Sequence, residues 1–299
     1  MALVDVVVVS YNSTDHLRAC IAPLAGLEDA AVIVVDNASA DDSLDTIADL
    51  PVKTIRRLTN GGFATGCNAG WRAGSAPFVL FLNPDATIDE SSLHRLVAVL
   101  EEDERIGAVA PRIEHPDGSL VHSLRRFPRL RSTFSRALYL HRLWPRSTWT
   151  DELVRDESSY RVPSEPEWVS GACLMARRSA LEQIGGWDEG FFFYSEDIDL
   201  CRRLWAAGLR IRFEPAAIAL HAGGASAPRS AMLPLLTESR LRYADKHGSR
   251  ASATLARVGL ALGSLTRVVL SRGGVATRRG HARALARALS RAPAERRSS

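Results

Sequence analysis

The sequence predicts an α/β protein built on a Rossmann-like open sheet with helices flanking its faces. Three observations support this fold class. Apolar, β-branched runs suited to buried strands alternate with helical patterns over roughly the first hundred residues. Each run ends in polar residues, as expected where an open α/β sheet binds ligands beyond the carboxyl ends of its strands. The 299 residues, 46% of them hydrophobic, fit one large globular domain or one domain with an appendage.

The predicted elements follow one another in strand, helix, strand order. Continuous apolar runs indicate strands buried on both faces, and Ser, Asp and Asn before periodic segments indicate helix starts. The expected strands are residues 6–13, 31–39, 52–57 and 78–86. The expected helices are residues 14–24, a segment opening near 41–43, a segment after the glycine-rich residues 59–70, and residues 91–102.

The middle of the chain is less regular. Residues 125–166 are rich in Arg, Pro and Trp without periodicity, and we expect a mobile substrate loop there. Residues 167–178 predict a strand, which a short helix from Ser179, a turn at residues 185–190 and a helix beginning near Ser195 follow.

Cysteine and charge usage favour a cytoplasmic protein with an acidic body and a basic tail. No run of eighteen uncharged apolar residues occurs, and the first residues lack the pattern of a signal peptide. The four cysteines lie far apart without a zinc-site spacing and are expected to be reduced and buried. Residues 250–299 hold eleven arginines and one acid, Glu295, which leaves the first 249 residues with a net charge of −6.

Polar residues follow the first two predicted strands. Ser10, Tyr11 and Asn12 end the first strand, and Asp36 and Asn37 end the second. Because these ends are neighbours in a parallel sheet, an acid there can accept hydrogen bonds from a ribose or a base, and Tyr11 offers a flat face. The alternative is that Asp36 only caps a turn and Tyr11 belongs to the core.

The glycine-rich segment and the end of the fourth strand carry weaker signals. The glycines at 61, 62, 66 and 70 do not form GxGxxG, which argues against a nicotinamide enzyme. Asn83-Pro84-Asp85 places two oxygen-bearing side chains so that both can face one ion or one diphosphate. As a lone tripeptide it is more often an ordinary turn.

Two further groups carry candidate chemistry. Ser195 stands at an expected N-cap before Glu196, Asp197 and Asp199, and acids in a first turn suit the helix dipole without any function. The apolar stripe of this helix leaves Asp197 exposed and ionised, as a base requires, whereas Asp199 is spaced for a surface ion pair with Arg203. His221 ends an apolar run and can be a surface residue or a metal ligand.

Six motifs follow one another along the chain: VVVVSYNS, VVDNASADDS, TNGGFATGCNAG, FLNPDA, GACLMARRSALEQIGGWDEGFFFYSEDIDLCRR and LHAGG. In this order they resemble the motifs of the family 2 glycosyltransferases of GT-A fold, and most of all those of their bacterial rhamnosyltransferase-like branch. The similarity spans roughly residues 4–224, and six ordered motifs are more specific than any one of them. It implies a GT-A type open mixed sheet.

The resemblance also implies roles for single residues. Asp85 and His221 bind a divalent metal, Mg²⁺ or Mn²⁺, and Asp197 is the catalytic base. Asn83 stands where many relatives have the first Asp of a DxD motif, which leaves the metal fewer charged ligands. The residues implied to hold the nucleotide of the donor are Ser10, Tyr11, Asn12, Asp36, Asn37, Asn60, Gly61, Gly62, Asn83 and Asp85.

The implied reaction is inverting transfer of a sugar, with L-rhamnose from dTDP-rhamnose as the first choice, to a glycan or polyprenyl-diphosphate-linked acceptor in cell-envelope polysaccharide synthesis. A UDP-sugar donor is the alternative. A sugar nucleotidyltransferase would need a Gly- and Arg-bearing loop after the first strand, where this chain has SYNS. A catalytically silent nucleotide-sugar binding protein is disfavoured because Asp85, Asp197 and His221 are all present.

The last fifty residues predict a basic helical extension, residues 248–299, to a catalytic domain of residues 1–247. Basic amphipathic helices lie on anionic membranes, which predicts a peripheral place at the inner face of the cell membrane. Alternatively, the first helix packs on the catalytic domain and the end is solvated; nucleic acid is not expected, because no aromatic residue interleaves with the arginines. The apolar stripe is Leu255, Val258, Leu262, Leu265 and Val269, and a later helix carries Arg283, Arg287 and Arg291 opposite Leu285 and Leu289.

Overall fold

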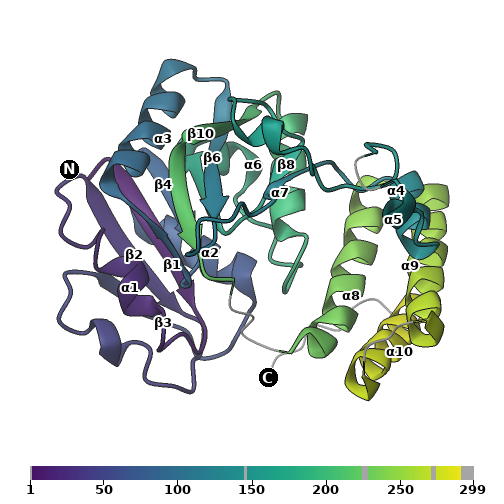
Figure 1. Ribbon diagram of the computed structural model, residues 1–299. Helices are drawn as coiled ribbons and strands as arrows, with labels where there is room; N and C mark the ends of the chain where they lie inside the picture. The colour runs from purple at the N-terminus through teal and green to yellow at the C-terminus, as the bar shows by residue number, and fades with distance from the viewer. Residues whose placement is uncertain (1, 145–146, 224–227, 271–273, 291–299) are drawn as a thin grey trace.

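An eight-stranded mixed sheet forms the centre of the computed structural model, which describes residues 2–144, 147–223, 228–270 and 274–290. The strand order is β3-β2-β1-β4-β9-β6-β10-β5 (Figure 1). Most neighbours are parallel, whereas β9 runs antiparallel to β4 and β6, and β5 antiparallel to β10. The strands are β1 (Val4–Ser10), β2 (Ala30–Asp36), β3 (Lys53–Arg56), β4 (Phe78–Leu82), β5 (Ala86–Ile88), β6 (Ile106–Glu114), β9 (Cys173–Arg177) and β10 (Arg210–His221).

Helices cover both faces of this sheet, as the apolar character of its strands requires. Every residue of β1 and β4 is buried. One face packs against α1 (Leu17–Ile21) and α3 (Glu90–Glu102). The other packs against α2 (Phe63–Ala73), α6 (Arg178–Ile184) and α7 (Glu196–Ala206). All four cysteines are buried and free, which confirms that expectation.

Two expected helices are shorter than predicted. The segment 14–24 holds only the five residues of α1, and the segment after residue 41 holds only the 3₁₀ turn η1 (Asp45–Ile47). The side chain of Asp41 bonds the Thr14 backbone and hydroxyl and the Ser43 hydroxyl. These local side-chain bonds hold a turn where capping residues predict a helix.

The expectation of a mobile loop at residues 125–166 is wrong in part, because helices and a strand occupy parts of that segment. The single strand expected at 167–178 is two. The chain forms β7 (Leu124–Arg125), α4 (Leu130–Ala137), α5 (Leu140–Leu143) and the 3₁₀ helix η2 (Glu157–Tyr160). β7 pairs with β8 (Trp168–Val169), and the fully buried Tyr160 donates its hydroxyl to the Val154 carbonyl. Contacts with residues far away in the sequence fix the structure of this segment, and such contacts leave no periodic pattern in its own residues.

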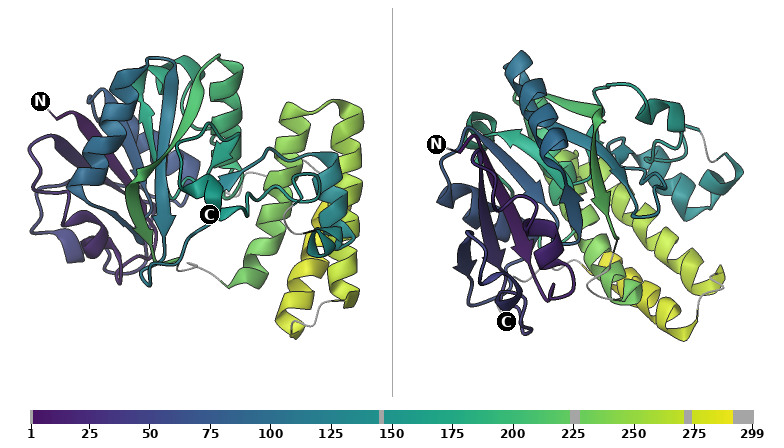
Figure 2. Two further views of the ribbon diagram at one scale, coloured as in Figure 1. Left: turned by 45° about the horizontal axis from the view of Figure 1, so that its top comes forward. Right: turned by 60° about the vertical axis from the view of Figure 1, so that its left-hand side comes forward.

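Three long helices end the described chain: α8 (Arg229–His247), α9 (Arg250–Leu270) and α10 (Val275–Leu289). Together with α4 and α5 they lie beside the sheet as a separate layer, here called the helical unit (Figures 1 and 2). The boundary predicted at residue 247 falls between α8 and α9, and it stays a prediction.

Small residues make the contacts of α9. Gly259 lies against Thr133 and Phe134 of α4, and Gly263 lies against Ala137. The predicted apolar stripe therefore points outward: Val258 is 52% exposed and Val269 64%. By length and composition α9 is the one helix of the described residues that could cross a membrane. Arg291 of the predicted basic face lies outside the described residues.

Candidate active site at the carboxyl edge of the sheet

The ends of β1 and β2 place the first candidate residues side by side. The two strands pair in parallel with Ser10 opposite Asp36, and the Asn37 backbone N–H donates to the Ser10 carbonyl at 2.8 Å. Ser10 and Asp36 are buried, whereas the ring of Tyr11 is 40% exposed. The Ser10 hydroxyl has no hydrogen-bond partner within the described structure. The unpartnered Ser10 hydroxyl can hydrogen-bond a bound ligand, and the exposed ring of Tyr11 can stack on a planar base.

Amide side chains connect this edge to the glycine-rich loop. Asn37 Nδ2 donates to Asn60 Oδ1 at 2.8 Å and to the Gly62 carbonyl at 3.1 Å. Its Oδ1 accepts from the Gly61 N–H at 3.2 Å. Asn12 takes a positive φ of 51° and accepts from the Ala40 N–H through Oδ1. The structure thus gathers the residues predicted for the nucleotide at one edge.

Gly62 brings the glycine-rich loop against the segment before α7. Its φ of 87° is left-handed, and a Cβ there would lie 2.2 Å from the Phe192 carbonyl oxygen. The same carbonyl accepts from the Phe63 N–H at 3.1 Å. Only glycine allows this approach, so the glycine-rich loop is held against the chain that leads into α7.

Asp85 and His221 meet although 136 residues separate them in sequence. β5 begins just after Asp85 and pairs antiparallel with the end of β10, so that His221 faces Ala86. His221 Nε2 lies 3.1 Å from Asp85 Oδ1, and the side chains are 19% and 12% exposed. A carboxylate oxygen and an imidazole nitrogen at this separation can share one divalent cation.

The segment Gly171–Ala172 connects the Asn83 turn to the acidic helix. The Asn83 backbone N–H donates to the Ala172 carbonyl at 2.9 Å. The adjacent Gly171 N–H donates to Asp197 Oδ2 at 3.3 Å, and the Ile198 N–H donates to Asp197 Oδ1 at 2.8 Å. Two successive residues thus hold the turn that carries Asp85 and the carboxylate of Asp197.

The environment of Asp197 differs from the exposed one expected. Its residue is half-buried, and burial raises its pKa, an effect that the Gly171 and Ile198 N–H groups and the charges of Arg125 and Arg240 oppose. The expectation that it projects freely into solvent is wrong, because Gly171 packs against it and bonds its carboxylate. Ser195 stands at the N-cap as expected, but with a left-handed φ of 66° and no side-chain capping bond.

Glu196 is the buried neighbour of this carboxylate. Burial raises the pKa of Glu196 well above its usual range, and the charge of Asp197 adds to the effect. Two adjacent carboxyl groups in a desolvated place favour one proton between them. Because only Asp197 has two backbone N–H donors, we assign the charge to Asp197 and the proton to Glu196.

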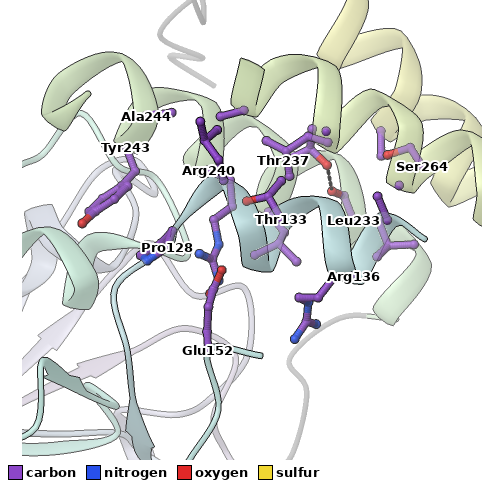
Figure 3. Close-up of a pocket in the computed structure, with 18 of the residues that line it drawn as sticks. Pro128, Thr133, Arg136, Glu152, Leu233, Thr237, Arg240, Tyr243, Ala244 and Ser264 are labelled. Atoms are coloured by element: carbon purple, nitrogen blue, oxygen red, sulfur yellow. Dashed lines mark hydrogen bonds and ion pairs between the residues drawn. The ribbon is translucent and has the colours of Figure 1, made fainter. Parts of the chain in front are cut away.

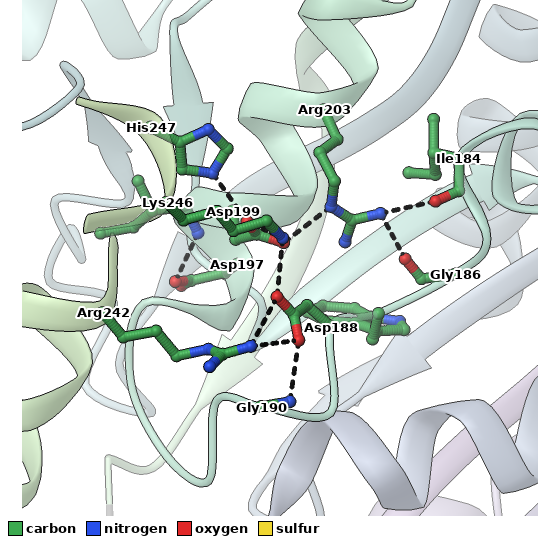
Figure 4. A network of polar contacts seen from close by, with 12 residues as sticks. Ile184, Gly186, Asp188, Gly190, Asp197, Asp199, Arg203, Arg242, Lys246 and His247 are labelled. Carbon is green, nitrogen blue, oxygen red and sulfur yellow. Dashed lines mark hydrogen bonds and ion pairs between the residues drawn. The ribbon is translucent and has the colours of Figure 1, made fainter. Parts of the chain in front are cut away.

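Asp199 plays a structural part in this segment. The predicted pair with Arg203 exists, at 2.7 Å, but Asp199 is fully buried and the pair is not on the surface. Lys246 Nζ and His247 Nε2 of α8 also lie 2.7 Å from Asp199 Oδ1 (Figure 4). Burial acts to raise the pKa of Asp199, but these hydrogen bonds and the Arg203 charge hold it at about 2. Asp199 thereby joins α7 to α8.

Sequence reasoning missed Arg125, Glu196 and Gly171. Arg125 lies in β7 with its guanidinium over the Trp168 ring, and its charge acts on Asp197. Gly171 stood inside a quoted motif, but no spacing rule shows that its N–H reaches an acid 26 residues later. The adjacent acids Glu196 and Asp197 were visible, and the difference in their burial was not.

This arrangement is suited to moving a group between two polar partners. One end offers amides, a carboxylate and an aromatic ring to a nucleoside. The middle offers a carboxylate and imidazole pair to a cation or phosphate. The other end holds a half-buried carboxylate with a raised pKa, which can accept a proton from a hydroxyl.

Comparison with known sequences gives a consistent result. The profile for glycosyl transferase family 2 matches residues 5–185, and the profile described as the N-terminal domain of galactosyltransferase matches residues 152–221. The N-acetylglucosaminyl-diphospho-decaprenol L-rhamnosyltransferase of Mycobacterium tuberculosis (strain ATCC 25618 / H37Rv) is 33% identical over 266 residues, 82% of this chain and 85% of that protein. Rhamnosyltransferase WbbL of Escherichia coli (strain K12) is 26% identical, over 73% of this chain and 83% of its own.

Solved structures share the fold at low identity. Mannosyltransferase PcManGT from Pyrobaculum calidifontis, in complex with GDP-Man and Mn²⁺, matches with a TM-score of 0.56 and 18% identity, over 97% of this chain and 81% of that one. GalNAc-T7 with UDP, GalNAc and Mn²⁺ matches with a TM-score of 0.59 and 15% identity, over 84% of this chain and 51% of that one. These likenesses confirm the predicted GT-A type sheet.

Proposed function

The chain belongs to glycosyl transferase family 2, and from that membership we propose that it transfers one sugar, with inversion, from a nucleoside diphosphate to an acceptor hydroxyl, with Asp197 as the base. One observation carries these roles. Gly171 and Ala172, adjacent in the chain, bond Asp197 and the Asn83 turn, so that base and diphosphate residues share one support. Ser10, Tyr11, Asn12, Asp36, Asn37, Asn60, Gly61 and Gly62 are proposed to hold the nucleoside end of the donor.

The proposed donor is dTDP-L-rhamnose, and the proposed acceptor is a glycan or polyprenyl-diphosphate-linked sugar of the cell envelope. Support comes from relatives whose names specify rhamnosyl transfer, one of them to N-acetylglucosaminyl-diphospho-decaprenol. A UDP-sugar is the alternative donor, because thymine differs from uracil by only one methyl group.

A divalent metal, Mn²⁺ or Mg²⁺, fits the site through Asp85 and His221. Their facing atoms are 3.1 Å apart, and Asn83 lies in the same turn. Among the described residues, no three or more His, Cys, Asp and Glu side chains are placed together to hold a metal ion, so the protein would supply few ligands and substrate phosphates the rest. When bound, the metal neutralises charge on the leaving diphosphate.

The protein residues account for the proton transfer. Asp197 accepts the proton of the acceptor hydroxyl as its oxygen attacks the anomeric carbon from the face opposite the diphosphate. Two N–H donors fix the orientation of the carboxylate, and burial brings its pKa closer to the operating pH, where general bases are most effective. A proton on Glu196 avoids a second negative charge beside the base.

The helical unit is proposed to hold the enzyme at the cytoplasmic face of an anionic membrane. α9 and α10 lie on the opposite side of the molecule from β2 and β3 (Figure 1). α9 presents Leu255, Val258, Leu265 and Val269 outward. α10 exposes Arg278, Arg279, Arg283 and Arg287. Apolar and basic side chains together favour anionic lipid surfaces.

Thermal shifts with a panel of nucleotide sugars test the donor assignment. A ligand that binds only the native state raises the melting temperature, and dTDP-rhamnose with Mn²⁺ should give the largest shift. A larger shift with a UDP-sugar would replace the donor. No shift with any donor would favour a protein that does not catalyse transfer.

A further inference from the structure

A cavity of about 1220 Å³ lies within the helical unit and reaches Arg202 of α7. Its walls come from α4, α5, α8, α9 and α10 and from Arg202 of α7. Figure 3 shows Thr133 of α4 beside Leu233 and Thr237 of α8, and Arg240 of α8 reaching Glu152. We call it the basic cavity. It is distinct from the strand ends, whose residues do not line it.

Arginine dominates the polar lining of the basic cavity. Among the described residues, six arginines line it against a single carboxylate, Glu152. Two further acids pair with lining arginines from outside: Asp151 with Arg136 and Glu167 with Arg129. The cavity thus holds a net positive charge even with its ion pairs counted. The lining arginines are Arg129, Arg136, Arg142, Arg202, Arg240 and Arg267.

The guanidinium groups are also pre-arranged. Arg142 and Arg267 both lie over the Tyr139 ring, at 4.6 and 5.2 Å from its centre. Arg202 lies over the Phe127 ring at 5.0 Å. Arg267 donates to the Gly263 and Arg136 carbonyls. Stacking on Tyr139 and Phe127 orients the guanidinium planes of Arg142 and Arg202, and guanidinium forks bind phosphate oxygens bidentately.

The rest of the wall is apolar and continues to the molecular surface. Leu233, Leu236 and Leu260 line the interior, and Leu270 lines it while being 63% exposed. Leu138, Leu143 and Trp144, next to the lining residues Tyr139 and Arg142, are also exposed. An apolar chain bound inside therefore has an apolar path outward.

We propose that the basic cavity binds the diphosphate and the first isoprene units of a polyprenyl-diphosphate-linked acceptor. This inference rests on the proposed function, since it supplies the site for that acceptor. The volume exceeds the usual 300–1,000 Å³ or so of small-ligand pockets, which leaves room for a chain beyond the diphosphate.

Arg240 connects the basic cavity with the proposed base electrostatically. Arg240 lines the cavity, pairs with Glu152 at 2.8 Å, and acts electrostatically on Asp197. A diphosphate near Arg240 would direct the attached sugar toward α7, while the chain leaves past Leu270. A nucleic acid would instead need an exposed basic surface without apolar walls.

Farnesyl diphosphate, a soluble prenyl diphosphate, is the probe for the test. Calorimetry on the full chain should show binding, weaker binding of inorganic diphosphate, and no competition by dTDP. Arg142→Ala and Arg202→Ala should each weaken farnesyl diphosphate binding about tenfold, as loss of a charge-assisted hydrogen bond does. Arg131→Ala is the matched control, because Arg131 is exposed on α4 and does not line the cavity.

Each outcome decides the proposal. It is overturned by absent binding to the wild-type chain, by displacement with dTDP, or by equal losses in Arg131→Ala and the cavity variants. Variants must keep wild-type dTDP affinity and melting temperature, which separates a lost site from lost folding. Binding of farnesyl diphosphate without transfer from any donor would sink the proposed function and leave the cavity assignment standing. If Arg142→Ala and Arg202→Ala transfer sugar with the wild-type acceptor KM, the cavity assignment fails and the proposed function stands.

Discussion

His247 Nε2, at the end of α8, lies 2.7 Å from Asp199 Oδ1 in the first turn of α7, two residues from the proposed base. Lys246 and Arg203 reach the same buried carboxylate. Arg242 and Lys246 also bind Asp188 in the turn before α7 (Figure 4). The helical unit is therefore fixed to the segment that carries Asp197, and damage to this junction should lower stability rather than remove a catalytic group.

We predict that Asp199→Asn lowers the free energy of unfolding by about 2–4 kcal/mol, because it leaves partly buried cations without their buried charge partner. Donor affinity should stay near wild type in the folded fraction. Asp245→Asn is the matched control, since Asp245 is exposed on α8 and 3.7 Å from Arg257. Its cost should be only a few tenths of a kcal/mol. Urea unfolding of both variants measures the difference, and equal costs would contradict the junction.

Acid should remove activity before it removes structure. Burial raises the pKa of Asp197, so turnover should fall as the pH drops through a value above the ordinary 3.9 or so of an aspartate. The pKa of Asp199 is about 2, so its contribution is complete above about pH 4 and is lost only as the pH falls toward 2. Turnover and circular dichroism measured over pH 3–8 should show a reversible loss of activity in folded protein. Turnover that persists until unfolding would refute the base assignment.

Asp85→Ala and His221→Ala should each weaken donor binding in Mn²⁺ and have little effect in EDTA. Each would remove one of the two ligands, whose atoms lie 3.1 Å apart. His115→Ala is a useful control, because the His115 imidazole lies 3.2 Å from the His221 backbone carbonyl and not at the His221 ring. Calorimetric titration with dTDP in Mn²⁺ or EDTA gives the comparison. If donor binding and turnover of the wild-type protein do not change in EDTA, a metal held by Asp85 and His221 is excluded.

The outward face of α9 should govern membrane association. The double change Leu255→Gln and Val258→Gln replaces side chains that are 47% and 52% exposed, so folding should be unaffected. Sedimentation with anionic liposomes should fall several-fold, and wild-type binding should weaken as salt rises. Leu58→Gln, at a fully exposed position after β3, should change nothing. Equal sedimentation of all three chains would remove the membrane role and leave the transferase role intact.

The sheet was predictable because its strands are continuous apolar runs whose ends carry polar residues. Ser10, Asp36 and Asn37 met as the parallel order requires. The meeting of Asp85 with His221 depends on the antiparallel pairing of β5 with β10, which follows from no local pattern. Only the resemblance to a family indicated it.

The burial of the acidic residues at the start of α7 could not be predicted from the periodicity of the sequence. Asp197 and Asp199 lie in the same turn, and sequence spacing placed both at the surface. Their environments instead come from Gly171, Lys246 and His247, at 26 to 48 residues along the chain. The packing face of α9 was missed in a similar way, because Gly259 and Gly263 provide it and apolar periodicity ignores glycine.

Single-turnover transfer by Asp197→Asn, compared with Glu196→Gln, tests the central claim most directly. The account predicts that Asp197→Asn loses about 10²- to 10⁴-fold in rate, the usual contribution of a general base, with donor affinity unchanged. Glu196→Gln imitates a carboxyl that already holds its proton, and its rate should stay within about tenfold of wild type. The account is contradicted if Asp197→Asn keeps more than about a tenth of the wild-type rate, or if Glu196→Gln is the more damaging change.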